Sequence, residues 1–89
     1  MVRRRYYFDG RVQGVGFRAT THQLARHHPV SGTVRNLDDG RVEVVAEGSA
    51  EALKAFVSAI QTALGRHIRN VRAEELPTGE PFAGFRVVN

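Results

Sequence analysis

The stretch VSGTVRNLDDGRVEVVAE, residues 30–47, decides the fold. It contains two runs that read as strands, Val30 to Asn36 and Arg41 to Glu47, joined by Leu37-Asp38-Asp39-Gly40. Gly40 tolerates the positive φ that a tight turn requires, so this joint predicts a β-hairpin. In the second run apolar residues alternate with two glutamates, which is typical of a strand with one buried face.

Helical patterns lie on both sides of this hairpin. The residues from Phe17 to about His28 place apolar side chains on one face, and Pro29 ends the helix because the residue before a proline is driven out of helical geometry. Ser49 is the predicted N-cap of a second helix, which Gly65 closes as a C′ glycine. Apolar residues repeat along that second helix at helical spacing: Leu53, Phe56, Val57, Ile60 and Leu64.

Three further segments read as strands, at Arg4 to Val12, Ile68 to Leu76 and, as a short final strand, Phe82 to Val88. The order βαββαβ predicts an α+β fold, a ferredoxin-like two-layer sandwich in which an antiparallel sheet carries both helices on one face. We expect residues 1–89 to form a single domain. This architecture hosts many unrelated activities, so function must be argued from the site.

The composition is that of an ordinary globular domain, with 42% apolar and 25% charged residues. The chain has no cysteine, which excludes disulfides, thiolate metal sites and a catalytic thiol. The apolar run near the N-terminus is too short for a signal peptide, and no stretch could span a membrane. We expect a cytoplasmic protein that does not bind membranes. We also expect a monomer, although no feature of the sequence determines the oligomeric state.

The net charge is +4, and Arg3 to Arg5 supply three of the thirteen cationic side chains. We interpret these arginines as a solvated terminal cluster, since such runs mark a solvated end more often than a binding surface. The net charge would still attract anionic substrates through its long-range field.

The segment GRVQGVGFR, Gly10 to Arg18, joins the first strand to the first helix. Gly14 and Gly16 let successive backbone N–H groups turn toward one point and form an anion nest. The helix that begins near Phe17 adds its positive N-terminal end, and the Arg18 guanidinium could grip two oxygens of the same anion. The segment is a candidate phosphate site, although an ordinary glycine-rich turn with a surface arginine has the same pattern.

Asn36 ends a strand immediately before the hairpin turn. An asparagine at this position commonly caps the turn through its own side chain. Its carbonyl and amide could equally hold a water molecule. The pattern alone leaves both roles open.

Other hydrolytic chemistries have little support in the sequence. The chain has one lysine, Lys54, and no long phosphate-binding loop that would contain it. The four histidines are not spaced as metal ligands, and no serine stands in the context of a nucleophile elbow. We therefore expect neither a metal nor a cofactor.

Two motifs resemble the signatures of the acylphosphatase family. Gly10-x-Val12-Gln13-Gly14-Val15-Gly16-Phe17-Arg18 is similar to the first, and Gly32-x-Val34-Arg35-Asn36-x-x-Asp39-Gly40-x-Val42 is similar to the second. Gly84-Phe85-Arg86-Val87 resembles the closing strand of the family. The resemblance extends over essentially the whole chain and implies a βαββαβ sandwich that hydrolyses acyl phosphates.

The resemblance also implies roles for individual residues. Arg18 would bind the phosphate and Asn36 would orient the attacking water, both as catalytic residues. The substrate-binding residues would be Gln13, Gly14, Val15, Gly16, Phe17 and Arg18. The chain departs from the family where Thr33 replaces a frequent large aromatic, where Arg66 follows Gly65 in place of a proline, and in the small residues Ala19-Thr20-Thr21. These departures concern packing, stability and substrate preference rather than the chemistry.

Two alternatives belong to other functional classes. One is a nucleic-acid-binding module on the same fold, because Gly14-Val15-Gly16-Phe17 faintly resembles an RNA-recognition signature. That signature lies within a strand, whereas this segment is predicted at a strand-to-helix turn, so we expect no specific nucleic-acid binding. The other is a non-catalytic domain that binds a small anion.

Overall fold

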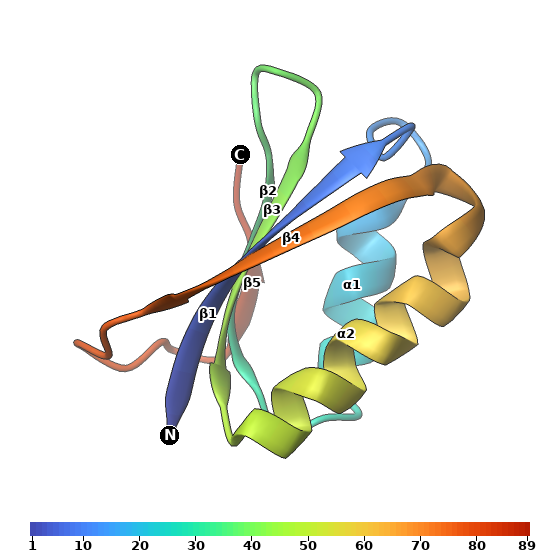
Figure 1. Ribbon diagram of the computed structural model, residues 1–89. Coiled ribbons are helices and arrows are strands. Elements are labelled where there is room, and N and C mark those ends of the chain that lie inside the picture. The colour runs from blue at the N-terminus through green and yellow to red at the C-terminus, as the bar shows by residue number, and fades with distance from the viewer.

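The computed structural model describes all residues, 1–89. Five strands and two α-helices follow one another in the predicted order βαββαβ, with β5 as the additional short final strand (Figure 1). A short 3₁₀ helix (η1) follows the second α-helix. The elements are β1 Val2–Gly10, α1 Phe17–Ala25, β2 Ser31–Asn36, β3 Val42–Gly48, α2 Ala50–Leu64, η1 Gly65–His67, β4 Ile68–Leu76 and β5 Phe85–Val87.

The strands form one sheet in the order β4-β1-β3-β2-β5, with both helices on the same face (Figure 1). The first four strands pair antiparallel, as expected for the ferredoxin-like sandwich. The expectation of a wholly antiparallel sheet is corrected at the edge, because β5 pairs with β2 in parallel. After β4 the chain crosses to the far edge of the sheet through residues 77–84, and it then runs in the direction of β2.

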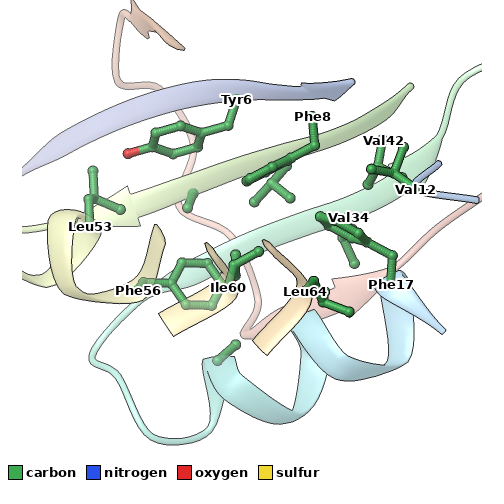
Figure 2. Close-up of a cluster of buried hydrophobic side chains, with 13 residues drawn as sticks. Tyr6, Phe8, Val12, Phe17, Val34, Val42, Leu53, Phe56, Ile60 and Leu64 are labelled. Carbon is green, nitrogen blue, oxygen red and sulfur yellow. The ribbon is translucent and has the colours of Figure 1, made fainter. Parts of the chain in front are cut away.

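The hydrophobic core lies between the helices and the sheet (Figure 2). Phe8 of β1 packs against Phe17 of α1 with ring centroids 5.1 Å apart, and Phe56 of α2 packs edge-on against Phe85 of β5. The α2 residues named from helical spacing are buried except Val57, which is half-buried. Neither helix has the length and apolarity that crossing a bilayer requires.

The two ends of α2 test the capping predictions. Ser49 is the N-cap, and its Oγ accepts a 3.0 Å hydrogen bond from the backbone N–H of Ala52, which confirms the prediction. Gly65 is not a C′ glycine in the left-handed region: its φ is −56°, and it begins η1. The chain continues in a tighter helical turn because the 3₁₀ geometry accommodates any residue with φ near this value.

The face of the sheet away from the helices carries a network of ion pairs. The Arg3 guanidinium lies 2.6 Å from a carboxylate oxygen of Glu47, and Glu43 accepts from Arg35 at 2.8 Å while its other oxygen lies 3.4 Å from Arg5. Glu43 and Glu47 are each only 7% exposed. The interpretation of Arg3 to Arg5 as a solvated terminal cluster is therefore wrong, because β1 begins at Val2 and its alternation directs Arg3 and Arg5 onto this paired surface.

Candidate active site

The loop between β1 and α1 contains two glycines in the left-handed region. Gly14 has φ 79° and Gly16 has φ 78°, values that side-chain-bearing residues rarely adopt. A Cβ atom at either position would meet no atom within 4 Å, so backbone conformation rather than lack of space requires glycine here. Such turns direct consecutive N–H groups to one side of the loop, as in an anion nest.

The start of α1 adds to this arrangement. Gly16 is the N-cap, so no side-chain cap bonds the N–H groups of the first turn. The first turn also contains no acidic residue. A helix N-terminus with free N–H groups attracts an anion through these donors and through the positive end of the helix dipole.

A cavity of about 330 Å³ opens beside the loop and the helix N-terminus. It brings together five of the sequence-predicted site residues, Gly14, Gly16, Phe17, Arg18 and Asn36. Gln13 and Val15 do not line it. The cavity also has three lining residues that the sequence analysis did not identify as part of a site: Val12, Ala19 and Val87.

Val87 could not be found from the sequence, because its place depends on the parallel pairing of β5. In that register Val87 lies opposite Val34 of β2, on the strand that ends at Asn36. Val87 is 44% exposed, and it and Met1 are the exposed large apolar residues of the protein. It forms an apolar part of the cavity wall.

Arg18 lies in the first turn of α1, where it is half-buried. The six ion pairs of the structure involve other arginines, so the Arg18 guanidinium has no carboxylate partner. Its donors are therefore available for an anion in the cavity, and a guanidinium can bind two oxygens of such an anion at once.

Asn36 occupies the last position of β2, opposite Val42 in register. Its Oδ1 atom is buried and has no hydrogen-bond partner in the protein. The turn is capped by Asp39 instead, whose Oδ1 accepts a 3.1 Å hydrogen bond from the backbone N–H of Arg41. Asn36 lines the cavity. Its buried Oδ1 is an acceptor without a partner in the protein, which is costly unless water or a ligand bonds it.

Gln13 connects the loop between β1 and α1 to the β2–β3 hairpin. Its Nε2 atom donates to the carbonyl of Leu37 at 2.8 Å and to the carbonyl of Arg41 at 3.0 Å. The side chain is thus directed toward the β2–β3 turn and away from the cavity.

The hairpin turn is also held electrostatically. The backbone N–H of Arg41 is the main cause that lowers the pKa of the Asp39 carboxyl, and the Arg41 guanidinium adds a 2.8 Å hydrogen bond. The same guanidinium lies over the Tyr7 ring, 4.4 Å from its centroid. These contacts fix the turn that Gln13 bonds.

The side chains around the cavity do not supply a metal site. No three histidine, aspartate or glutamate side chains gather anywhere in the structure in a way that could hold a metal ion. The polar groups at the cavity are a guanidinium, an amide and backbone N–H groups. This donor set suits an anion rather than a cation.

Comparison with known proteins identifies the class of protein that has this fold and cavity. The family model described as Acylphosphatase matches residues 4–87, and the chain belongs to the acylphosphatase family. An acylphosphatase from Bacillus licheniformis is 43% identical over 88 residues, which cover 98% of each chain. One from Bacillus velezensis is 45% identical over 78 residues, which cover 88% of this chain and 84% of that protein.

The solved structures agree with the sequence relatives. The crystal structure of acylphosphatase from Bacillus subtilis matches with a TM-score of 0.88 at 36% identity, over 100% of each chain. The activity of the chain is accordingly that of an acylphosphatase, an enzyme that hydrolyses acyl phosphates.

Proposed function

We propose that the cavity is the active site, where some residues bind the phosphoryl group and another positions the attacking water. The backbone N–H groups of residues 14–18 and the Arg18 guanidinium bind the phosphoryl oxygens and stabilise the charge of the transition state. Asn36 orients the attacking water through its side-chain amide. The observation that carries this assignment is that one cavity is lined by the loop glycines, by Arg18, which makes no ion pair, and by Asn36, whose buried Oδ1 has no hydrogen-bond partner.

The reaction needs little from the protein besides positioning. The oxygen of the water attacks phosphorus, the bond from phosphorus to the acyl oxygen breaks, and its electron pair leaves with the carboxylate. Because the conjugate acid of that carboxylate has a pKa of about 4, the leaving group needs no general acid. Phosphoryl transfer then depends mainly on alignment and on charge stabilisation.

The proton of the water needs a destination, and Asn36 is too weak a base to accept it. We assign the proton to a phosphoryl oxygen of the substrate itself, which gives inorganic phosphate as the second product. Arg18 and the loop N–H groups neutralise the phosphate, which is the task a divalent cation performs in many phosphoryl-transfer enzymes. Hydrolysis is accordingly proposed to be independent of metal ions.

The proposal extends to how the protein acts in the cell. Residues 1–89 would act as one domain and as a monomer, in the cytoplasm, on small acyl phosphates and without specific binding of nucleic acid. The ion pairs of Arg3 and Arg5 support the last point, because paired arginines offer less charge to a phosphate backbone.

The direct test is the hydrolysis of benzoyl phosphate, followed against the spontaneous rate in the same buffer. Turnover that the enzyme accelerates, and that Arg18→Ala abolishes, supports the assigned site. Full activity in the Arg18→Ala protein would place the active site elsewhere.

A further inference from the structure

A second, separate hollow lies where β1 ends and β4 begins. It has a volume of about 220 Å³ and is lined by Gly10, Arg11, Arg66, His67, Ile68 and Arg69. None of these residues lines the active-site cavity. Three of the six are arginines, and none of the six is acidic.

The three arginines of this hollow are electrostatically uncompensated. Arg11, Arg66 and Arg69 are exposed and take part in none of the six ion pairs, whereas Arg3, Arg5 and Arg35 on the open sheet face all have carboxylate partners. Asp9, the acidic residue next to the hollow in sequence, does not line it and also makes no ion pair. Like charges gathered around one hollow repel one another, and an anion bound there would remove that repulsion.

The backbone holds the arginines at this place. The pairing of β1 with β4 shifts between Asp9 and Gly10: Asp9 is opposite Asn70 and Gly10 is opposite Ile68, which leaves Arg69 as the extra residue of a bulge. A bulge changes the direction of a side chain that regular pairing would place on a sheet face.

Gly10 makes this bulge possible. Its φ is 133°, and a Cβ atom there would lie 2.4 Å from the backbone oxygen of His67 and 2.8 Å from the backbone nitrogen of Arg69. The strand can approach η1 and the start of β4 this closely only with glycine. The hollow is therefore built by the local geometry of the chain and does not depend on flexible side chains alone.

We propose that this hollow is a second anion site, which binds a small multivalent anion such as a diphosphate or the phosphate group of a small metabolite. Guanidinium groups are suited to this class of ligand, because each can bind two phosphate oxygens in a fixed geometry. A single-stranded nucleic acid would instead require an extended basic groove with aromatic side chains for stacking, and no phenylalanine, tyrosine or tryptophan lines the hollow.

Isothermal titration with inorganic diphosphate tests this site. The active-site cavity also attracts phosphate oxygens, so the titration is run on the wild type and on Arg18→Ala. We expect two sites in the wild type and one in Arg18→Ala. In the Arg18→Ala background, Arg66→Gln with Arg69→Gln should weaken the remaining site at least about tenfold, since two charge-assisted contacts are lost.

The matched control is Arg72→Gln with Arg86→Gln in the same background. These two arginines are also exposed and unpaired, lie outside the hollow, and remove the same formal charge. We expect the control pair to bind diphosphate as the Arg18→Ala protein does. Equal weakening by both pairs would reduce the effect to general charge attraction and overturn the proposal, as would the absence of any saturable site in Arg18→Ala.

Two further outcomes are distinguishable from these. A thymidine oligonucleotide that binds more tightly than diphosphate and requires Arg66 and Arg69 would show a nucleic-acid surface and overturn the small-anion proposal. The Arg18→Ala protein could also retain two diphosphate sites, one of which is lost when Arg66 and Arg69 are replaced. That result would support the second anion site and contradict the role proposed for Arg18.

Discussion

The Gln13 side chain donates a 2.8 Å hydrogen bond to the carbonyl oxygen of Leu37, and so joins the loop between β1 and α1 to the turn between β2 and β3. A second bond from the same amide reaches the carbonyl of Arg41 at 3.0 Å. The loop contains the proposed anion nest, and Leu37 directly follows Asn36. In the proposed mechanism, Gln13 therefore links the phosphate-binding loop to the residue that orients water, at the end of the sheet where the loop and the hairpin lie (Figure 1).

Replacing Gln13 with Ala should lower kcat by about tenfold, because a small displacement of positioned groups is costly in catalysis. Inhibition by inorganic phosphate should change much less, since the nest remains intact. Gln13→Glu should not restore the rate, because a carboxylate cannot donate to the two carbonyls. Steady-state kinetics check this, with Gln23→Ala on the exposed face of α1 as the control. A wild-type kcat in Gln13→Ala would show that the link has no positioning role.

Removing the Glu43 carboxylate should destabilise the protein without altering the active site. Its two oxygens serve Arg35 and Arg5, and the residue is buried on the open face of the sheet. We expect Glu43→Ala to lower the free energy of unfolding by about 1–3 kcal/mol, as for other part-buried charged hydrogen bonds. Urea denaturation measures this loss.

The control for Glu43 is Glu75→Ala. The Glu75 carboxylate is 68% exposed and lies 3.8 Å from Arg4, so its loss should cost less than about 1 kcal/mol. Equal losses in the two variants would mean that burial on the sheet face adds nothing to the Glu43 ion pairs.

Asp39 makes the hairpin sensitive to acid. Its pKa is lowered in the folded state, chiefly by the backbone N–H of Arg41, from an ordinary value of 3.8. A depressed folded pKa contributes stability that is fully present above the unfolded pKa and is lost as the pH falls through the folded pKa. NMR titration of Asp39 should therefore give a pKa below 3.8. As the pH falls below 3.8, Asp39→Asn should lose less stability than the wild type. An Asp39 carboxyl that titrates at its ordinary pKa would contradict the turn geometry.

Chelation should leave the activity unchanged. Arg18 and the loop N–H groups take the role of the cation in the proposed mechanism, and the cavity has no carboxylate or histidine ligands. Hydrolysis of benzoyl phosphate is measured before and after dialysis against a chelator. A rate that falls on chelation and returns with Mg²⁺ or Zn²⁺ would contradict the mechanism.

Local sequence signals were sufficient for most of the fold. The alternation in residues 42–47 and the serine cap at Ser49 gave β3 and the start of α2, because both depend on neighbours in the chain. The parallel direction of β5 and the pairing of Arg3 with Glu47 were missed, since they depend on residues far apart in sequence. The helix α2 ends at Gly65 as predicted, but Gly65 is not a left-handed C′ glycine, because a glycine allows a positive φ without requiring it.

The site was partly predictable for the same reason. Gly14, Gly16 and Arg18 lie within one short loop, so their spacing was enough to indicate an anion nest. The approach of Asn36 to this loop could be inferred only through the family resemblance, and the part of Val87 only from the register of β5. The direction of the Gln13 side chain depends on the carbonyls of the distant hairpin, which no sequence pattern reports.

In the proposed mechanism Arg18 binds phosphate while Asn36 acts on the water. Asn36→Ala should lower kcat by roughly a hundredfold or more, the loss expected for one positioning or polar catalytic contact. Arg18→Ala should lose both turnover and phosphate binding. Arg18→Lys should also perform poorly, because an ammonium group cannot reproduce the planar two-oxygen contact.

The most direct measurement is the inhibition constant of inorganic phosphate, determined together with kcat for each variant that retains measurable turnover. For a variant without measurable turnover, a phosphate-binding titration replaces it. Circular dichroism confirms that each variant is folded. We expect phosphate to inhibit Asn36→Ala at nearly the wild-type concentration and to bind the active site of Arg18→Ala far more weakly. If folded Asn36→Ala loses phosphate binding as severely as Arg18→Ala, the proposed division of roles is wrong.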